Sequence, residues 1–73
     1  MLIRNSQDFG TLVKQVRNKL KLTQPAVASA CGTGTRFIVD LEHGKPTCEL
    51  EKALRVASML GIKIDAIEPT QKQ

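Results

Sequence analysis

Aromatic side chains are nearly absent from this chain of 73 residues, which contains Phe9 and Phe37 but no Trp and no Tyr. Proteins that bind single-stranded nucleic acids stack the bases on aromatic side chains. A chain with only 3% aromatic residues offers few such stacking platforms. The composition therefore argues against a single-strand binder.

Cysteine and histidine are scarce as well, with Cys31, Cys48 and His43 as the whole set. The two cysteines are too few for a disulfide framework and too far apart for a CxxC pair, and one histidine cannot complete a usual structural zinc set. We therefore expect buried or incidental thiols, no metal and no cofactor. Because the sequence offers no catalytic constellation around His43, it predicts neither an enzyme nor a small-molecule substrate.

Long apolar runs are missing too. No segment approaches the roughly 20 apolar residues of a transmembrane helix. Residues 1–5 also lack the apolar region of a secretion signal. We therefore expect a cytoplasmic protein with no membrane partner.

What the chain does have is positive charge, since 11 Lys and Arg against 7 Asp and Glu give a net charge of +4. A basic balance favours an anionic partner, such as a nucleic acid, a membrane surface or an acidic protein. A chain this short also buries only a small core and gains stability from a disulfide, a metal or a second subunit. Since the first two are not expected, the composition favours a homodimer.

Apolar residues at three- and four-residue spacing predict a helix over residues 6–20, capped by Asn5 or Ser6. Its apolar stripe consists of Phe9, Leu12, Val13, Val16 and Leu20. A second helix of about two turns is predicted to begin at a Thr23 cap and to end at Gly32.

The next two helices are predicted from caps and glycine stops in the same way. Thr33 is predicted to cap a third helix that Gly44 ends, and a fourth helix is predicted from Thr47 to Gly61. The residues expected to face inward from the fourth helix are Leu50, Ala53, Leu54, Ala57 and Leu60.

Alternating apolar residues over 62–67 predict a short C-terminal β-strand. A lone strand is not stable in water, so it needs a partner, which can be Leu2 and Ile3 or the same segment of a second subunit. The expected dimerisation residues are Ile62, Ile64, Ala66 and Ile67. Residues 68–73 are expected to form a flexible tail behind a single domain over residues 1–67.

Two short helices joined by a glycine-containing turn make a helix-turn-helix, whose second helix enters the DNA major groove. The positions that fit this motif are Leu22, Thr23, Gln24, Val27, Ala28, Gly32, Ile38, Leu41, Glu42, Gly44, Lys45 and Pro46. In these residues the chain resembles phage-repressor-like regulators of the Cro/C1, or XRE, type, and the resemblance extends over about residues 9–62. It implies a compact all-α domain of four to five helices, like that of lambda repressor, with double-stranded operator DNA as its partner.

A narrower resemblance rests on Arg36 to Glu42, on Gly44 to Thr47, and on Leu54 to Val56 followed by Gly61 and the terminal strand. These segments are similar to those of HipB-like antitoxins. The resemblance implies a homodimer, tied together partly by its C-terminal strands, that represses its own operon and binds a Hip-type kinase toxin. The alternatives are a stand-alone phage-repressor-like or restriction-controller-like regulator without a toxin, and a helical module that docks another protein.

The residues expected to reach base edges are Thr33, Gly34, Thr35 and Arg36, at the start of the third helix. Arg36 can donate two hydrogen bonds to guanine, or form an ion pair with Asp40 one turn later, and both can hold if Asp40 orients Arg36. Asp40 can accept from a cytosine amino group or repel DNA. Thr35 suits a phosphate or a thymine methyl, and Gly34 allows close approach to the DNA backbone.

Phosphate contacts are expected on either side of the third helix. Gln24 begins the second helix, whose dipole favours an anion at this end. Thr23 is primarily a cap and secondarily a phosphate contact, and Lys45 faces phosphate by the resemblance. Phe37 is expected to pack in the core, with DNA backbone contact or a dimer interface as alternatives.

The family pattern also pairs Arg17 with Glu42 in a partly buried structural salt bridge. The arginine fork is suited to hold a carboxylate through two hydrogen bonds.

Overall fold

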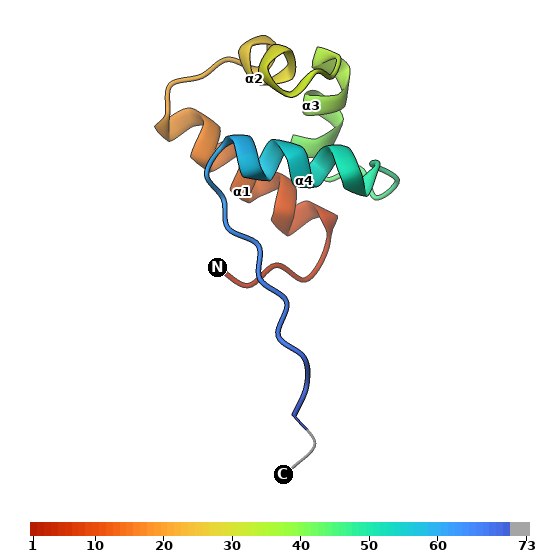
Figure 1. Cartoon of the computed structure of the whole chain (residues 1–73). Helices are drawn as coiled ribbons and strands as arrows, with labels where there is room; N and C mark the ends of the chain where they lie inside the picture. Colours follow the sequence, from red (N-terminus) through yellow and green to blue (C-terminus); the bar gives the residue numbers. More distant parts are fainter. Residues whose placement is uncertain (71–73) are drawn as a thin grey trace.

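Helices make up the regular secondary structure of residues 1–70, the part of the chain that the computed structural model describes. They are α1 (Ser6–Lys19), α2 (Gln24–Cys31), α3 (Thr35–Glu42) and α4 (Leu50–Met59). In Figure 1, α2 and α3 lie together at one end, α1 and α4 cross below them, and the C-terminal segment leads away at the opposite end. The predicted small all-helical architecture is confirmed.

The core is small and draws on every helix. Val13, Val27, Ile38 and Val56 come from α1, α2, α3 and α4 in turn, and each is 0% exposed. Burying one such side chain contributes roughly 1.5–3 kcal/mol. The other core residues are Ala28, Cys31, Leu41, Ala53, Ala57 and Leu60.

The first two helices begin and end close to the predicted residues. The Asn5 side chain accepts a hydrogen bond from the Asp8 amide at 2.8 Å, and Thr23 Oγ1 accepts one from the Ala26 amide at 3.1 Å. Gly32 ends α2 in the left-handed region, with φ of 69°. Leu20 caps the end of α1 and is 50% exposed, so its predicted place in the apolar stripe is wrong.

The prediction that Thr33 caps α3 is wrong. Its backbone amide donates to the Ala28 carbonyl at 2.9 Å, which ties Thr33 to the end of α2. This closure places Gly34 in extended conformation as the N-cap residue of α3, one position later than expected. Gly34 is therefore outside the first helical turn and avoids the cost of a glycine inside a helix, although it provides no side-chain cap for α3.

The helix α4 begins later than the sequence predicts. Pro46 and Thr47 lie in a turn, Cys48 packs against the core, and the helix begins only at Leu50. The buried face of α4 consists of Ala53, Val56, Ala57 and Leu60. Leu50 and Leu54 are 71% and 41% exposed, which corrects the prediction that both face inward.

The predicted strand over residues 62–67 is not found in the described part of the chain. The Ile62 amide donates to the Ala57 carbonyl at 2.8 Å and closes the end of α4, and the residues after it lie in no ladder. Leu2 and Ile3 also lie outside any strand. The physical reason is that alternation favours a strand only where a neighbour can exchange backbone hydrogen bonds, and residues 1–70 of this single chain provide no such neighbour. Of the predicted tail, residues 68–70 have no regular structure and residues 71–73 lie outside the described part.

A buried ion pair joins α1 to the end of α3. Arg17 Nε and Nη2 donate to the two carboxylate oxygens of Glu42 at 2.5 and 2.9 Å, and both residues are buried. Arg17 Nη1 also donates to the Leu22 carbonyl at 2.8 Å, which fixes the connection into α2. The hydrogen bonds with Glu42 raise the pKa of the Arg17 guanidinium, although burial lowers it. One guanidinium thus holds three parts of the chain.

Gly10 lets α1 and α3 approach each other at the level of their backbones. A Cβ atom at this position would overlap the Leu41 carbonyl oxygen and lie 2.9 Å from that of Glu42. Nearby, Ser6 Oγ donates to the Gly44 carbonyl at 2.8 Å. The N-terminal half of α1 is therefore seated directly against the last turn of α3.

We expect Gly10→Ala to destabilise the fold by roughly 1–3 kcal/mol, because overpacking against backbone oxygens outweighs the better helix propensity of alanine. Urea denaturation followed by circular dichroism measures the effect. Thr11→Ala is the control, since it also raises helix propensity but lies at an exposed position of the same helix. Equal stability of the Gly10 variant and the wild type would contradict the close-packing argument.

We expect Glu42→Gln to destabilise the fold by about 3–5 kcal/mol, because it leaves the buried Arg17 charge without its carboxylate. Thermal melting checks this, with Glu51→Gln as the control, since Glu51 lies exposed on α4. A melting temperature that stays at the wild-type value in the Glu42 variant would show that the ion pair does not stabilise the fold.

Candidate nucleic-acid interface

The N-terminal end of α3 is exposed while its opposite face is anchored. Ile38 and Leu41 are buried in the core, and Thr35 and Arg36 face solvent. Arg36 has 85% of its side chain exposed. Because the buried apolar residues of this short helix lie on one side, its polar side remains exposed to solvent and accessible to a partner.

A three-membered charge cluster lies along this exposed side. Asp40 Oδ1 is 3.3 Å from Arg36 Nε, and Asp40 Oδ2 is 3.5 Å from Lys45 Nζ. The Asp40 side chain is only 22% exposed, whereas Lys45 is 53% exposed. The carboxylate therefore sits between two more exposed cations and faces each with a different oxygen.

The contact between Asp40 and Lys45 is not predicted by helical spacing. Residues five apart do not face each other on a continuous helix. Here the chain reverses at Gly44, where φ is 81°, and the Lys45 amide donates to the Asp40 carbonyl at 3.0 Å. The glycine after α3 was the available signal that Lys45 folds back over the last turn.

At the start of α2, the Gln24 side chain is half-buried and held by Glu42. Its Nε2 atom donates to Glu42 Oε1 at 3.1 Å. Because an amide nitrogen carries two hydrogens, the second remains available to an anion in front of the helix. Thr23 is exposed beside it and caps the helix. The buried ion pair therefore also orients Gln24.

The other predicted site residues differ in their positions. Phe37 is half-buried and packs against the core, with Lys52 Nζ 5.8 Å from the ring centroid, so its ring belongs to the α3–α4 packing. Thr33 is half-buried in the turn between α2 and α3, and its hydroxyl donates to the Gly34 carbonyl at 3.3 Å. Gly34 is exposed at the tip of this turn.

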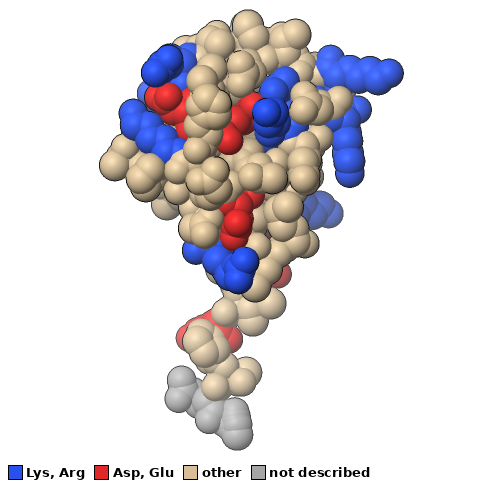
Figure 2. Space-filling model, turned by 180° about the vertical axis from the view of Figure 1, so that it is seen from behind, with Lys and Arg blue, Asp and Glu red and all other residues tan. Residues whose placement is uncertain are grey.

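Positive charge gathers on one face of the helical body. Figure 2 shows Lys and Arg side chains gathered around its upper part, with acidic side chains set among them. In residues 1–70, no three His, Cys, Asp or Glu side chains come together to hold a metal ion. Burial raises the pKa values of the Cys31 and Cys48 thiols, which keeps both protonated at neutral pH. Over the same residues, no helix has the length and apolar character needed to cross a membrane.

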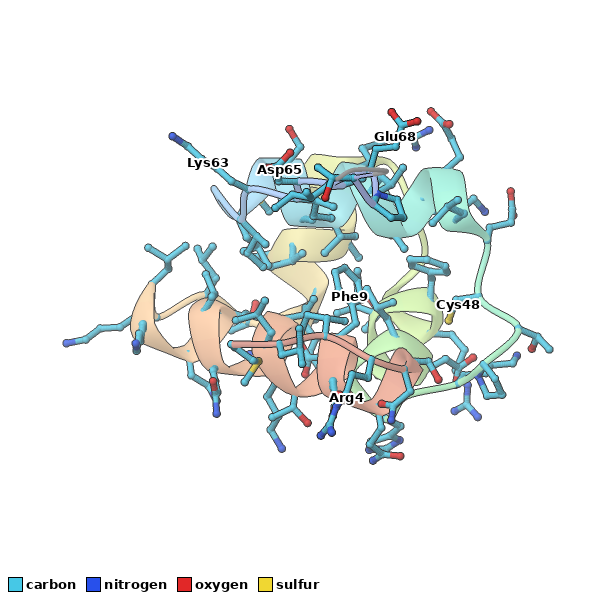
Figure 3. All side chains as sticks on the ribbon, turned by 90° about the horizontal axis from the view of Figure 1, so that it is seen from below. Arg4, Phe9, Cys48, Lys63, Asp65 and Glu68 are labelled. Carbon is cyan, nitrogen blue, oxygen red and sulfur yellow. The ribbon has the colours of Figure 1, made fainter. Side chains whose placement is uncertain are left out.

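A separate, apolar groove lies at the other end of the molecule. It has a volume of about 510 Å³ and is lined mainly by Leu2, Ile3, Phe9, Leu12, Ile62 and Ile64. In Figure 3, Arg4 lies on the α1 side, Lys63 and Asp65 lie on the α4 side, and Phe9 lies between them. The predicted dimerisation residues Ile64 and Ile67 are 55% and 87% exposed, and Ala66 is also exposed.

Comparison with known proteins agrees with the geometry of α2 and α3. A family model described as helix-turn-helix matches residues 13–67. An uncharacterized HTH-type transcriptional regulator, y4mF of Sinorhizobium fredii, is 44% identical over 71 residues, which cover 97% of this chain and 93% of the relative. Both matches include the two helices, the turn between them and the buried residues beneath. The chain therefore belongs to the XRE-type helix-turn-helix family of transcriptional regulators.

Proposed function

We propose that this protein is a sequence-specific repressor that binds duplex DNA with α3 in the major groove. The observation that carries the proposal lies at the N-terminal end of α3. Arg36 is 85% exposed there, while the opposite face of the helix is buried in the core. A guanidinium held on a rigid helix can donate two hydrogen bonds to guanine. Thr35 and Gly34 lie beside Arg36 at the same end, where the first residues of a recognition helix approach the bases.

Phosphate contacts would fix the orientation of α3 in the groove. The start of α2 offers the Thr23 cap, the Gln24 amide and the positive end of the helix dipole. Lys45 lies beyond the other end of α3 and carries a side chain that is about half exposed. Thr33, in the turn, is a further proposed contact, whereas the packing of Phe37 supports a structural role instead.

We expect Arg36→Ala to weaken binding to a preferred duplex by about 1–3 kcal/mol and to relax the preference for guanine at one position. The duplex is obtained by selection from a random pool with the wild-type chain, and affinity is measured by fluorescence anisotropy. Arg4→Ala is the control, because it removes the same charge from the exposed N-terminal segment. If both variants lose the same affinity and neither changes base preference, Arg36 does not read the sequence.

A homodimer is the second part of the proposal, because operators with two half-sites are read by two recognition helices. The apolar groove and the exposed side chains of Ile64, Ala66 and Ile67 support a second copy of this segment as the occupant. If the two segments run antiparallel about Ile64, Lys63 of one protomer faces Asp65 of the other. Ile62 then faces Ala66, and the apolar side chains share one face. The Lys63–Asp65 pairs would each contribute roughly 0.2–1 kcal/mol.

We expect Ile64→Asp to give a folded monomer with weakened operator binding, because Ile64 is 55% exposed in the single chain and central to the proposed pairing. Sedimentation equilibrium measures the mass. The double substitution Lys63→Asp with Asp65→Lys is the control, since it exchanges the charges and keeps their complementarity. A wild-type chain that sediments as a monomer at all concentrations would contradict the proposed dimer.

The resemblance to HipB-like antitoxins adds a partner to this proposal, namely a Hip-type kinase toxin whose operon the protein represses. The features that support it are the segments from Arg36 to Thr47 and from Leu54 to Gly61. The alternative is a stand-alone regulator without a toxin. The y4mF relative is named only as an HTH-type transcriptional regulator, which is compatible with this alternative. Co-purification with a kinase encoded beside the gene supports the antitoxin role, and a neighbourhood without such a kinase supports the alternative.

A further inference from the structure

Asp40 occupies a position where a carboxylate is unfavourable for the helix itself. It lies in the last turn of α3, at the negative end of the helix dipole. It also faces the surface through which the protein would approach a polyanion. Neither the helix dipole nor the phosphate charge of DNA favours an acidic residue here.

The contacts of Asp40 give it a different role. Its two oxygens face Arg36 Nε at 3.3 Å and Lys45 Nζ at 3.5 Å, and its side chain is the least exposed of the three. We infer that Asp40 determines specificity by withholding these two cations from non-specific phosphate contact while it orients Arg36 for a base. The inference rests on the proposed function and adds to it the means by which the surface distinguishes one duplex from another.

The geometry of the guanidinium explains how both effects come from one carboxylate. The Nε side of Arg36 is directed toward Asp40, which leaves the Nη1 and Nη2 edge for the paired acceptors of guanine. A lone phosphate must instead compete with Asp40 for Arg36 and for Lys45. The carboxylate thus costs affinity on every duplex, but it costs least where a guanine is correctly placed.

Asp40→Asn tests this inference because it keeps the size of the side chain and removes its charge. Each added phosphate contact raises the binding constant roughly eightfold at about 0.1 M salt. We expect the variant to bind a random-sequence duplex pool about five- to tenfold more tightly, with a salt slope steeper by about one. We also expect a smaller ratio of affinities between the selected duplex and the random pool.

Three matched variants separate this role from a general effect of charge. Glu68→Gln removes the same charge from the C-terminal segment, far from α3, and should leave the slope unchanged (Figure 1). Asp40→Glu keeps the charge and should retain the wild-type slope. In an Arg36→Ala background, Asp40→Asn should gain less affinity for the random pool, because one of the two cations is already missing.

The outcomes distinguish this inference from the proposed function. If the wild-type chain binds neither the selected duplex nor the random pool, the proposed function fails. If it binds duplex DNA but Asp40→Asn has the salt slope and specificity ratio of the wild type, only the role of Asp40 is overturned. An equal gain with and without Arg36 would also overturn it, because the carboxylate would then act by simple repulsion. Circular dichroism of each variant confirms that the compared chains are folded.

Discussion

The buried pair of Arg17 and Glu42 is the interaction on which the functional end of this molecule depends. Glu42 is the last residue of α3, where the helix dipole opposes a carboxylate, so its charge is tolerated only because the guanidinium faces it with two nitrogens. The same guanidinium fixes the Leu22 carbonyl, and the same carboxylate receives Gln24. One charged contact therefore links α1, α2 and α3.

The charges outside the core have a different use. Around Asp40 the ion pairs are partly exposed, and such pairs contribute little to stability. In the proposed function, their effect is on the availability of Arg36 and Lys45 to DNA. On this proposal, a small domain uses one kind of contact in two ways, to fix helices where water is excluded and to adjust affinity where it is not.

Much of the fold follows from periodicity and caps, which locate α1 and α2 within about one residue. The first residues of α3 and α4 are not predicted correctly, because backbone hydrogen bonds and turns determine where these helices begin. The Thr33 amide closes α2, and the chain leaves Gly44 through a turn before α4 begins. Neither the backbone contact of Thr33 nor the turn after Gly44 is visible in the pattern of side chains. The alternation over residues 62–67 misleads for another reason, because it shows which side chains share a face but not whether a neighbouring strand exists.

The site is predictable to the extent that it follows helical spacing. Arg36 and Asp40 are one helical turn apart, so the sequence alone allows their pairing. The contacts of Asp40 with Lys45 and of Gln24 with Glu42 join different segments, so only the packed fold reveals them. The family match adds the class of regulator to this picture.

The close approach of α1 and α3 at Gly10 has a consequence for how regulators of this kind diversify. Since backbone rests on backbone there, the seat of α3 does not depend on the size of any side chain on its solvent side. Substitutions at Thr35, Arg36 or Asp40 can then change the chemistry of the exposed side of α3 without moving the helix. If α3 reads DNA as proposed, its base preference can change through substitutions on this exposed side while the packing that supports the helix stays the same.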